Sequence, residues 1–183
     1  MSADDKLLIE RALQIVPVIR ESRDFGERQR RLAPSVLAAL HDARLFRMMI
    51  PRDVDGLQAD PTTSMAVVET IAAADGAAGW NLMIGMAYGI WASRLPLDAA
   101  RTIYGAANAV VAGALRPTGR LRGVEGGFIA NGRWTFASRI GHSDWWLGGC
   151  VVHEGDAPKK TAAGGPDVRL VFFPAADGTL IDT

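Results

Sequence analysis

The sequence predicts an α+β protein in which helices come first and an antiparallel, barrel-like sheet follows. Three observations predict this order: apolar residues recur at helical spacing in the first half, the period changes to two after residue 108, and an Asn-Gly pair at residues 131–132 separates two short strand-like runs. We therefore expect a helical domain over residues 1–107 and a β-domain over residues 108–183.

The first half has the apolar spacing of amphipathic helices. A first helix is predicted because apolar side chains recur at steps of four, three and four residues and so share one face: Leu8, Ala12, Ile15 and Ile19. A second helix is expected over residues 35–45. It is followed by a loop over residues 48–61, which Pro51 and Gly56 favour.

Three more helices are expected before the period changes. Residues 62–64 are Thr-Thr-Ser, whose hydroxyls commonly cap a helix N-terminus, so a third helix is expected to begin there. A fourth helix is expected over residues 80–93, after an interruption at Gly76 and Gly79. A fifth is expected over residues 96–105.

The second half has the short apolar runs of β-strands. They predict strands over residues 109–114, 128–130, 133–137, 145–153 and 168–173. Asn131-Gly132 suits a type I′ hairpin turn, in which both central residues need positive φ. On the second arm of that hairpin, alternation would place Trp134, Phe136 and Ser138 on one face.

Composition excludes several classes of partner. The 183 residues include 20 basic and 20 acidic side chains, which cancel, so no general attraction to nucleic acid or to an anionic membrane is expected. The longest apolar run, residues 81–92, is too short to span a bilayer. The single cysteine, Cys150, cannot form an intramolecular disulfide, which is consistent with a cytoplasmic protein.

Familiar catalytic motifs are absent from the sequence. It contains no GxGxxG, Walker, HExxH, CxxC or GxSxG pattern. The three histidines, His41, His142 and His153, are far apart and do not have metal-ligand spacing, so no metal site is expected. Cys150, in an apolar strand with no base nearby in sequence, is read as a buried structural thiol.

Two segments remain as candidates for ligand binding. Residues 111–120 run into a Pro-Thr-Gly turn, which would expose backbone N–H groups and a hydroxyl, although many ordinary hairpins contain such a turn. Residues 133–146 combine three tryptophans and a phenylalanine with serines. Such a surface can stack on an aromatic heterocycle and hydrogen-bond its edge, or it can be the core of a sheet. From the residues alone both readings are open.

Five segments, in this order, resemble the acyl-CoA dehydrogenase superfamily of flavoproteins: RMMIPRDVDGLQADP, ETIAAADGAAGWNLMIG, GALRPTGR, FIANGRWTFASRIGHSDWW and VRLVFFPAADGTLIDT. Each is loose, but the ordered set covers nearly the whole chain. The family fold is a helical domain, a middle β-barrel and a C-terminal four-helix bundle. The resemblance therefore implies that this chain ends inside the middle domain, truncated before that bundle.

Within the superfamily, the chain looks more like the flavin-dependent hydroxylase branch, the oxygenase components of two-component monooxygenases. The dehydrogenase branch typically has Thr-Glu-Pro where this chain has Leu115-Arg116-Pro117. That branch also has tryptophan and threonine at the places of Phe136 and Ser138. The Phe-Ala-Ser version is hydroxylase-like.

The resemblance also implies a cofactor and a site. Phe136 would flank the isoalloxazine, with Ala137 beside it, and Ser138 would hydrogen-bond near N5. Leu115, Pro117 and Thr118 would line the ring and its pyrimidine side. Reduced FMN or FAD, supplied by a separate flavin reductase, would meet oxygen to give a C4a-hydroperoxide that hydroxylates a small aromatic or polycyclic substrate.

The remaining implications concern parts beyond Thr183. The main catalytic residue and the tetramer interface of the family lie in the C-terminal bundle, so the full-length protein is expected to be a homotetramer. The 183-residue chain alone is expected to be inactive.

Some residues depart from the family pattern. Arg139 follows Ser138 where hydroxylases commonly have glycine, and it would crowd the flavin or pair with a phosphate. Asp55-Gly56 replaces the usual Gly-Gly. Hydroxylases often have a substrate-contacting histidine on the helix near residues 86–91, where Tyr88 is the nearest polar aromatic here.

Two alternatives stay open. One is an acyl-CoA dehydrogenase, which would use tightly bound FAD and a C-terminal glutamate for α,β-desaturation of an acyl thioester. The other is a non-catalytic, truncated binding or assembly module, because a chain without the bundle would have to cover its own sheet.

Overall fold

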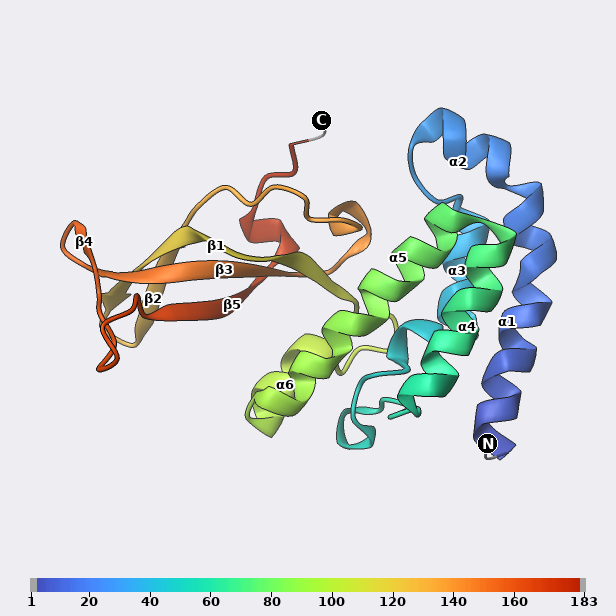
Figure 1. The fold of residues 1–183 in the computed structure, drawn as a ribbon, viewed down its shortest axis with the longest axis horizontal. Coiled ribbons are helices and arrows are strands. Elements are labelled where there is room, and N and C mark those ends of the chain that lie inside the picture. Colours follow the sequence, from blue (N-terminus) through green and yellow to red (C-terminus); the bar gives the residue numbers. More distant parts are fainter. Residues whose placement is uncertain (1–2, 182–183) are drawn as a thin grey trace. The chain divides into compact units, whose positions relative to one another are not determined.

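The computed structural model describes residues 3–181. The chain divides into two compact units, Met1–Val110 and Val111–Thr183. Helices build the first unit, and a sheet with short 3₁₀ turns builds the second (Figure 1). The predicted order, helices followed by a sheet, is confirmed.

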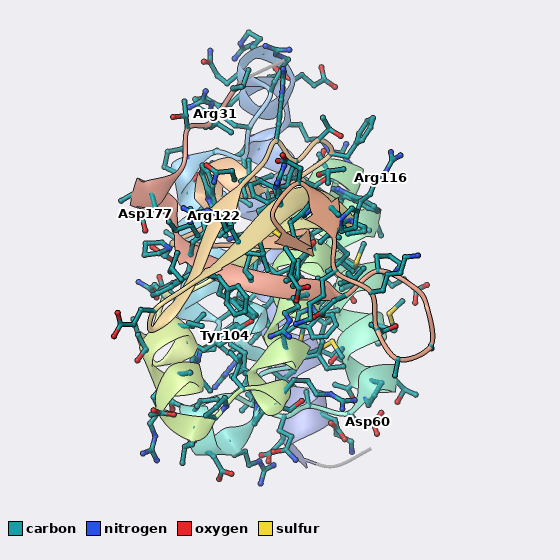
Figure 2. All side chains as sticks on the ribbon, turned by 90° about the vertical axis from the view of Figure 1, so that its left-hand side faces the viewer. Arg31, Asp60, Tyr104, Arg116, Arg122 and Asp177 are labelled. Atoms are coloured by element: carbon teal, nitrogen blue, oxygen red, sulfur yellow. The ribbon has the colours of Figure 1, made fainter. Side chains whose placement is uncertain are left out.

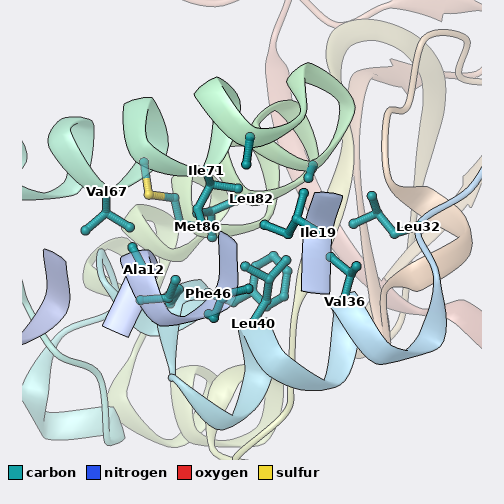
Figure 3. Packing of buried hydrophobic residues seen from close by; sticks show 14 of the residues in the cluster. Ala12, Ile19, Leu32, Val36, Leu40, Phe46, Val67, Ile71, Leu82 and Met86 are labelled. Carbon is teal, nitrogen blue, oxygen red and sulfur yellow. The ribbon is translucent and has the colours of Figure 1, made fainter. Parts of the chain in front are cut away.

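Six α-helices make up most of the first unit: α1 (Ala3–Glu21), α2 (Arg23–Gln29), α3 (Pro34–Asp42), α4 (Pro61–Ala74), α5 (Gly76–Ala87) and α6 (Leu97–Tyr104). Three 3₁₀ turns connect them: η1 (Leu45–Arg47), η2 (Arg52–Val54) and η3 (Tyr88–Arg94). The apolar face predicted for the first helix is buried. It packs into one core with side chains of α3, η1, α4 and α5, labelled in Figure 3: Val36, Leu40, Phe46, Val67, Ile71, Leu82 and Met86.

The structure corrects two predicted helix starts. The cap of α4 is Asp60, which is labelled in Figure 2, and not a hydroxyl of residues 62–64. Its Oδ1 accepts the N–H of Thr62 at 2.8 Å. The fourth predicted helix, α5, begins at Gly76 rather than residue 80, because Asp75 caps it by accepting the N–H of Ala78 at 2.7 Å.

Gly79, predicted to interrupt the helix, lies inside α5. A methyl group there would lie 2.4 Å from the Cβ of Ala72 on α4. The glycine therefore permits the close approach of α4 and α5 instead of ending a helix.

Arg47 is the largest fully buried side chain of this unit, with 2% exposure. Its guanidinium donates to the carbonyls of Val54 at 2.7 Å, Tyr104 at 3.0 Å and Ala106 at 2.9 Å. It also donates to the Asp55 carbonyl at 2.9 Å. Burial lowers the pKa of Arg47, while the charge of Asp55 acts in the opposite direction. The side chain ties η2 to the chain that leaves α6.

The Asp55-Gly56 departure has a structural account in this loop. Asp55 has a left-handed φ of 60°, which aspartate tolerates better than most residues. Its carboxylate pairs with Arg44 at 3.0 Å. Gly56 cannot be replaced without movement, because a methyl group there would lie 1.9 Å from the carbonyl oxygen of Ile50.

The second unit is a five-stranded sheet of β1 (Val111–Val124), β2 (Gly127–Asn131), β3 (Trp145–Glu154), β4 (Ala157–Pro158) and β5 (Val168–Pro174). β2, β1 and β3 are neighbours in that order, and β4 and β5 both pair with β3. The predicted strands over residues 145–153 and 168–173 correspond to β3 and β5.

The sheet is mixed, so the prediction of a wholly antiparallel sheet is wrong in one pairing. β1 and β3 run parallel, whereas the other pairs are antiparallel. The reason lies in residues 132–144. β2 ends beside Arg120 and β3 begins beside Val111, so this connection carries the chain back to the start of β1 before β3 begins.

The predicted hairpin at Asn131-Gly132 is also wrong. The turn instead joins β1 to β2 at Glu125-Gly126, where Gly126 has a φ of +80° and Val124 pairs with Gly127. Neither residue of Asn131-Gly132 has positive φ. Residues 133–137 form no strand, so the predicted alternation of faces does not apply to them.

Candidate functional site

The first candidate segment lies in a distortion of β1. Ala114 pairs with Gly148, Pro117 with Gly149 and Gly119 with Cys150 on β3. From Ala114 to Pro117 the chain of β1 advances three residues while β3 advances one, and from Pro117 to Gly119 it advances two residues while β3 again advances one. The extra residues of this bulge are Leu115, Arg116 and Thr118.

The predicted Pro-Thr-Gly turn is therefore wrong, because Pro117, Thr118 and Gly119 stay within β1. Pro117 has no N–H for a strand ladder, and proline inside a strand is found mostly at edges and bulges. The bulge still exposes the residues that were expected to line a ligand: Leu115, Pro117 and Thr118 are all exposed. Arg116 lies in the bulge and Arg122 farther along the same strand (Figure 2).

Gly149 on β3 makes room for the bulge. A methyl group there would lie 2.2 Å from the carbonyl oxygen of Leu115 and 2.8 Å from that of Arg116. Only a residue without a side chain allows the extra length of β1 to lie over β3 at this point. The shape of the candidate surface thus depends on a residue of a different strand.

Trp134 anchors the second candidate segment to the sheet. Its indole lies over three glycines: a methyl group would approach a ring atom to 2.4 Å at Gly119, 3.0 Å at Gly132 and 2.7 Å at Gly148. Its Nε1 donates to the carbonyl of Gly149 at 2.8 Å. Of the two readings of the aromatic segment, core packing therefore holds for Trp134.

A hydrogen bond joins the two candidate segments. The Thr118 hydroxyl donates to the carbonyl of Arg133 at 3.0 Å. The chain of residues 132–134 therefore runs along the bulge, held by this bond on one side and by the Trp134 indole on the other. A bulged strand cannot offer a regular ladder, which explains why residues 133–137 do not form the predicted strand.

Phe136 differs from Trp134, because the residue is 96% exposed. Its backbone has a left-handed φ of 58°, which costs an L-residue roughly 1–2 kcal/mol. Burial of such a side chain contributes about 1.5–3 kcal/mol. A ligand that covered the ring would gain this burial free energy, which the protein alone does not have. Strained residues of this kind cluster at functional sites.

Ala137 and Ser138 follow in a half-buried turn that ends in η4 (Ile140–His142). The N–H of Ile140 donates to the carbonyl of Ala137 at 3.2 Å. Within the described part of the chain, the Ser138 hydroxyl has no hydrogen-bond partner. It is therefore available to a ligand.

Arg139 closes this turn. The side chain is only 7% exposed, and Nη1 donates to the carbonyl of His142 at 2.7 Å. The φ of 67° is left-handed, the region that favours glycine, which accounts for the glycine expected here. Burial lowers the pKa of Arg139 to about 10, and the charge of Asp144 acts in the opposite direction. The guanidinium therefore contacts residues of its own turn, His142 and Ser143.

Three of these residues carry groups of the kind that bind a flat heterocycle. The exposed ring of Phe136 offers a face for stacking, Leu115 offers an apolar contact, and Ser138 offers a free hydroxyl. Among residues 3–181, no group of three or more histidine, cysteine, aspartate or glutamate side chains is arranged to hold a metal ion. In the same residues, no helix has both the length and the hydrophobicity to cross a bilayer.

Comparison with known proteins places these features in a family. Residues 12–95 match the acyl-CoA dehydrogenase N-terminal domain. Indole-3-acetate monooxygenase of Pseudomonas putida is 33% identical over 145 residues, which cover 78% of this chain and 36% of that protein. HsaA of Rhodococcus jostii, the oxygenase subunit of a flavin-dependent monooxygenase, is 30% identical over 149 residues, covering 80% of this chain and 39% of HsaA.

Solved structures show that the fold of this chain also occurs in known proteins. XiaF from Streptomyces sp., in complex with FADH2 and glycerol, has a TM-score of 0.86 and 25% identity, covering 98% of this chain and 44% of XiaF. The 3-HSA hydroxylase from Rhodococcus sp. RHA1 has a TM-score of 0.86 and 26% identity, covering 96% of this chain and 45% of the hydroxylase. The chain spans less than half the length of these relatives. It belongs to the acyl-CoA dehydrogenase superfamily.

Proposed function

We propose that this chain carries part of the flavin site of a two-component monooxygenase, as its oxygenase component. The full protein would hydroxylate a small aromatic or polycyclic substrate. The observation that carries the proposal is Phe136, an aromatic residue that is 96% exposed on a left-handed backbone, two residues before a serine whose hydroxyl has no hydrogen-bond partner among residues 3–181. The names of the similar proteins, indole-3-acetate monooxygenase and HsaA oxygenase subunit, support this reaction class.

Each candidate residue has a role in this proposal. Phe136 and Ala137 lie against the isoalloxazine, and Ser138 hydrogen-bonds near N5. Leu115 and Pro117 cover the ring from the bulge. Thr118 lines the pyrimidine side, and its hydroxyl holds the neighbouring segment through the carbonyl of Arg133.

The proposed cofactor is reduced FMN or FAD, which supplies the electrons that activate molecular oxygen. XiaF was solved with FADH2 and KijD3 with FMN, so the proposal includes both forms of flavin. The chain's own residues would stack on the ring, exclude water from it and offer a hydrogen bond at its edge. No step of this role requires a charged side chain at the ring face.

The proposal includes a partner and an assembly. Reduced flavin would come from a separate flavin reductase, as the words "oxygenase subunit" and "oxygenase component" in the names of relatives suggest. A homotetramer and a cytoplasmic location belong to the same proposal and rest on the family resemblance and the single cysteine. An acyl-CoA dehydrogenase activity is less well supported, because the curated relatives are named as monooxygenases or hydroxylases.

Anaerobic titration with reduced FMN and reduced FAD tests the proposal. We expect Phe136→Ala to weaken flavin binding about tenfold, since base–aromatic stacking is worth about 1–3 kcal/mol. The matched control is Phe128→Ala on β2, which removes a 46% exposed phenylalanine of the same unit. That variant should bind flavin as the parent does. Absence of binding by the parent, or an equal effect of both substitutions, would contradict the proposal.

A further inference from the structure

The turn that carries Ser138 contains a buried cation with no evident role in the core. Arg139 is 7% exposed although its neighbours Phe136 and Gly141 are exposed. Its left-handed φ of 67° is a conformation that glycine adopts at no steric cost. An arginine that accepts both burial and an unfavourable backbone must be held by specific contacts.

The contacts of Arg139 form a local network within its own turn. Nη1 of Arg139 donates to the His142 carbonyl at 2.7 Å and to the Ser143 hydroxyl oxygen at 3.3 Å. The Ser143 hydroxyl donates in turn to the carbonyl of Arg139 at 3.1 Å. The N–H of His142 donates to that same carbonyl at 2.9 Å. Side chain and main chain of Arg139 thus both bind the residues that end the turn.

We propose that Arg139 is a positioning residue: it locks residues 139–143 into one conformation and thereby fixes the hydroxyl of Ser138 for a hydrogen bond with the edge of a bound flavin. This inference rests on the proposed function. Ser138 directly precedes the lock, and Trp134 anchors the same segment on its other side. The segment between two fixed points presents Phe136 and Ser138.

The chemistry of the side chain suits this role. With its pKa at about 10, the guanidinium stays protonated at neutral pH and donates continuously. One nitrogen, Nη1, serves two acceptors from a planar and rigid guanidinium, whereas a lysine ammonium is a point charge on a flexible stem. A glycine would satisfy the backbone but would supply no donor. The lock therefore depends on the side chain, not on the turn conformation alone.

Amide hydrogen exchange without flavin tests the lock itself. In Arg139→Gly, exchange at the His142 and Ile140 amides should accelerate about tenfold, because the side-chain bonds that close the turn are lost. Ser143→Ala, which removes one partner and keeps the arginine, should give a smaller change of the same kind. If Arg139→Gly is not obtained folded, the same exchange measurement on Ser143→Ala and Arg139→Lys tests the lock.

The matched control is Arg30→Gly. Arg30 also has a left-handed backbone, with a φ of 51°, but its side chain is exposed and it ends α2 in the helical unit. Replacing it relieves a similar backbone conformation far along the chain from Ser138. Exchange in the turn of residues 139–143 should be unchanged in this variant. Unchanged exchange in the Arg139 and Ser143 variants would overturn the inference.

A double-mutant cycle on reduced-flavin affinity separates positioning from a merely structural role. Ser138→Ala should weaken binding about fivefold in the parent and by less than about twofold in the Arg139→Gly background, since the effects of coupled residues do not add. Additive effects would overturn the inference while leaving the proposed function intact. A parent protein that binds no reduced flavin would overturn the proposed function, and this role of Arg139 with it.

Discussion

Among the described residues, each unit contains one buried arginine, Arg47 or Arg139, and the two make different kinds of contact. Arg47 in the helical unit reaches carbonyls 57 and 59 residues away, at Tyr104 and Ala106. Arg139 in the sheet unit donates to residues only three and four positions away, His142 and Ser143. The first arginine joins distant segments of a core. The second shapes a surface turn, and the difference predicts that one controls stability and the other local order.

Removing Arg47 should have the largest effect on folding. Arg47→Met leaves the buried carbonyls of Val54 and Tyr104, and the carbonyl of Ala106, without their donor, so the free energy of unfolding should fall by about 2–5 kcal/mol. Urea denaturation measures this loss. Arg52→Met, an exposed arginine of η2, is the control and should change stability by less than about 0.5 kcal/mol. A small loss in Arg47→Met would remove the contrast with Arg139.

Gly149→Ala should have an intermediate effect, concentrated on the bulge. The added methyl group would lie 2.2 Å from the Leu115 carbonyl oxygen, so β1 must move, at a cost of about 1–3 kcal/mol. Because Leu115 and Thr118 belong to the displaced segment, flavin affinity should fall as well. Thermal unfolding and flavin titration measure the two effects.

Gly123→Ala provides the control for this prediction. Gly123 lies on the same strand, and a methyl group there would meet no atom within 4 Å. Both readouts should stay at the parent values. If the two alanine variants behave alike, the bulge does not depend on Gly149.

The helical unit was more predictable from sequence than the candidate site. The face of Leu8, Ala12, Ile15 and Ile19 follows from spacing alone, because a helix is determined by neighbours three and four residues away. Arg47 was missed for the opposite reason. Its partners at Tyr104 and Ala106 are distant in sequence, and nothing local to Arg47 marks it as buried.

The candidate site shows the same limit more sharply. The bulge at Leu115 needs a glycine on β3, Gly149, and no pattern within β1 reveals that partner. The Asn-Gly turn preference was outweighed by Gly126, which closes the β1–β2 hairpin with a φ of +80°. Local chemistry did point to the segment containing Phe136 and Ser138. It could not predict that Phe136 would be exposed and that Trp134 would pack against the sheet.

Cys150 gives the smallest predicted effect and tests how closely the sheet packs beneath the bulge. It is fully buried, and a methyl group at Gly119 would lie 2.5 Å from its Sγ. Burial raises the pKa of the Cys150 thiol from 9.0 to about 11, so the folded state holds the proton more tightly than the unfolded state. This contribution to stability is complete below pH 9 and is lost as the pH rises toward 11.

Other groups also titrate in this range, so the measurement is a difference between two proteins. The free energy of unfolding of the parent should fall more steeply between pH 9 and pH 11 than that of Cys150→Ala. A thiol reagent at pH 8 should modify Cys150 only at the rate at which the sheet opens, because the thiolate is the nucleophile and the folded thiol is neutral and covered. Equal slopes in the two proteins, together with rapid labelling, would mean that water reaches Cys150. The sheet beneath the bulge would then be as open to water as the surface above it, and close packing around Cys150 would not be what holds the bulge in shape.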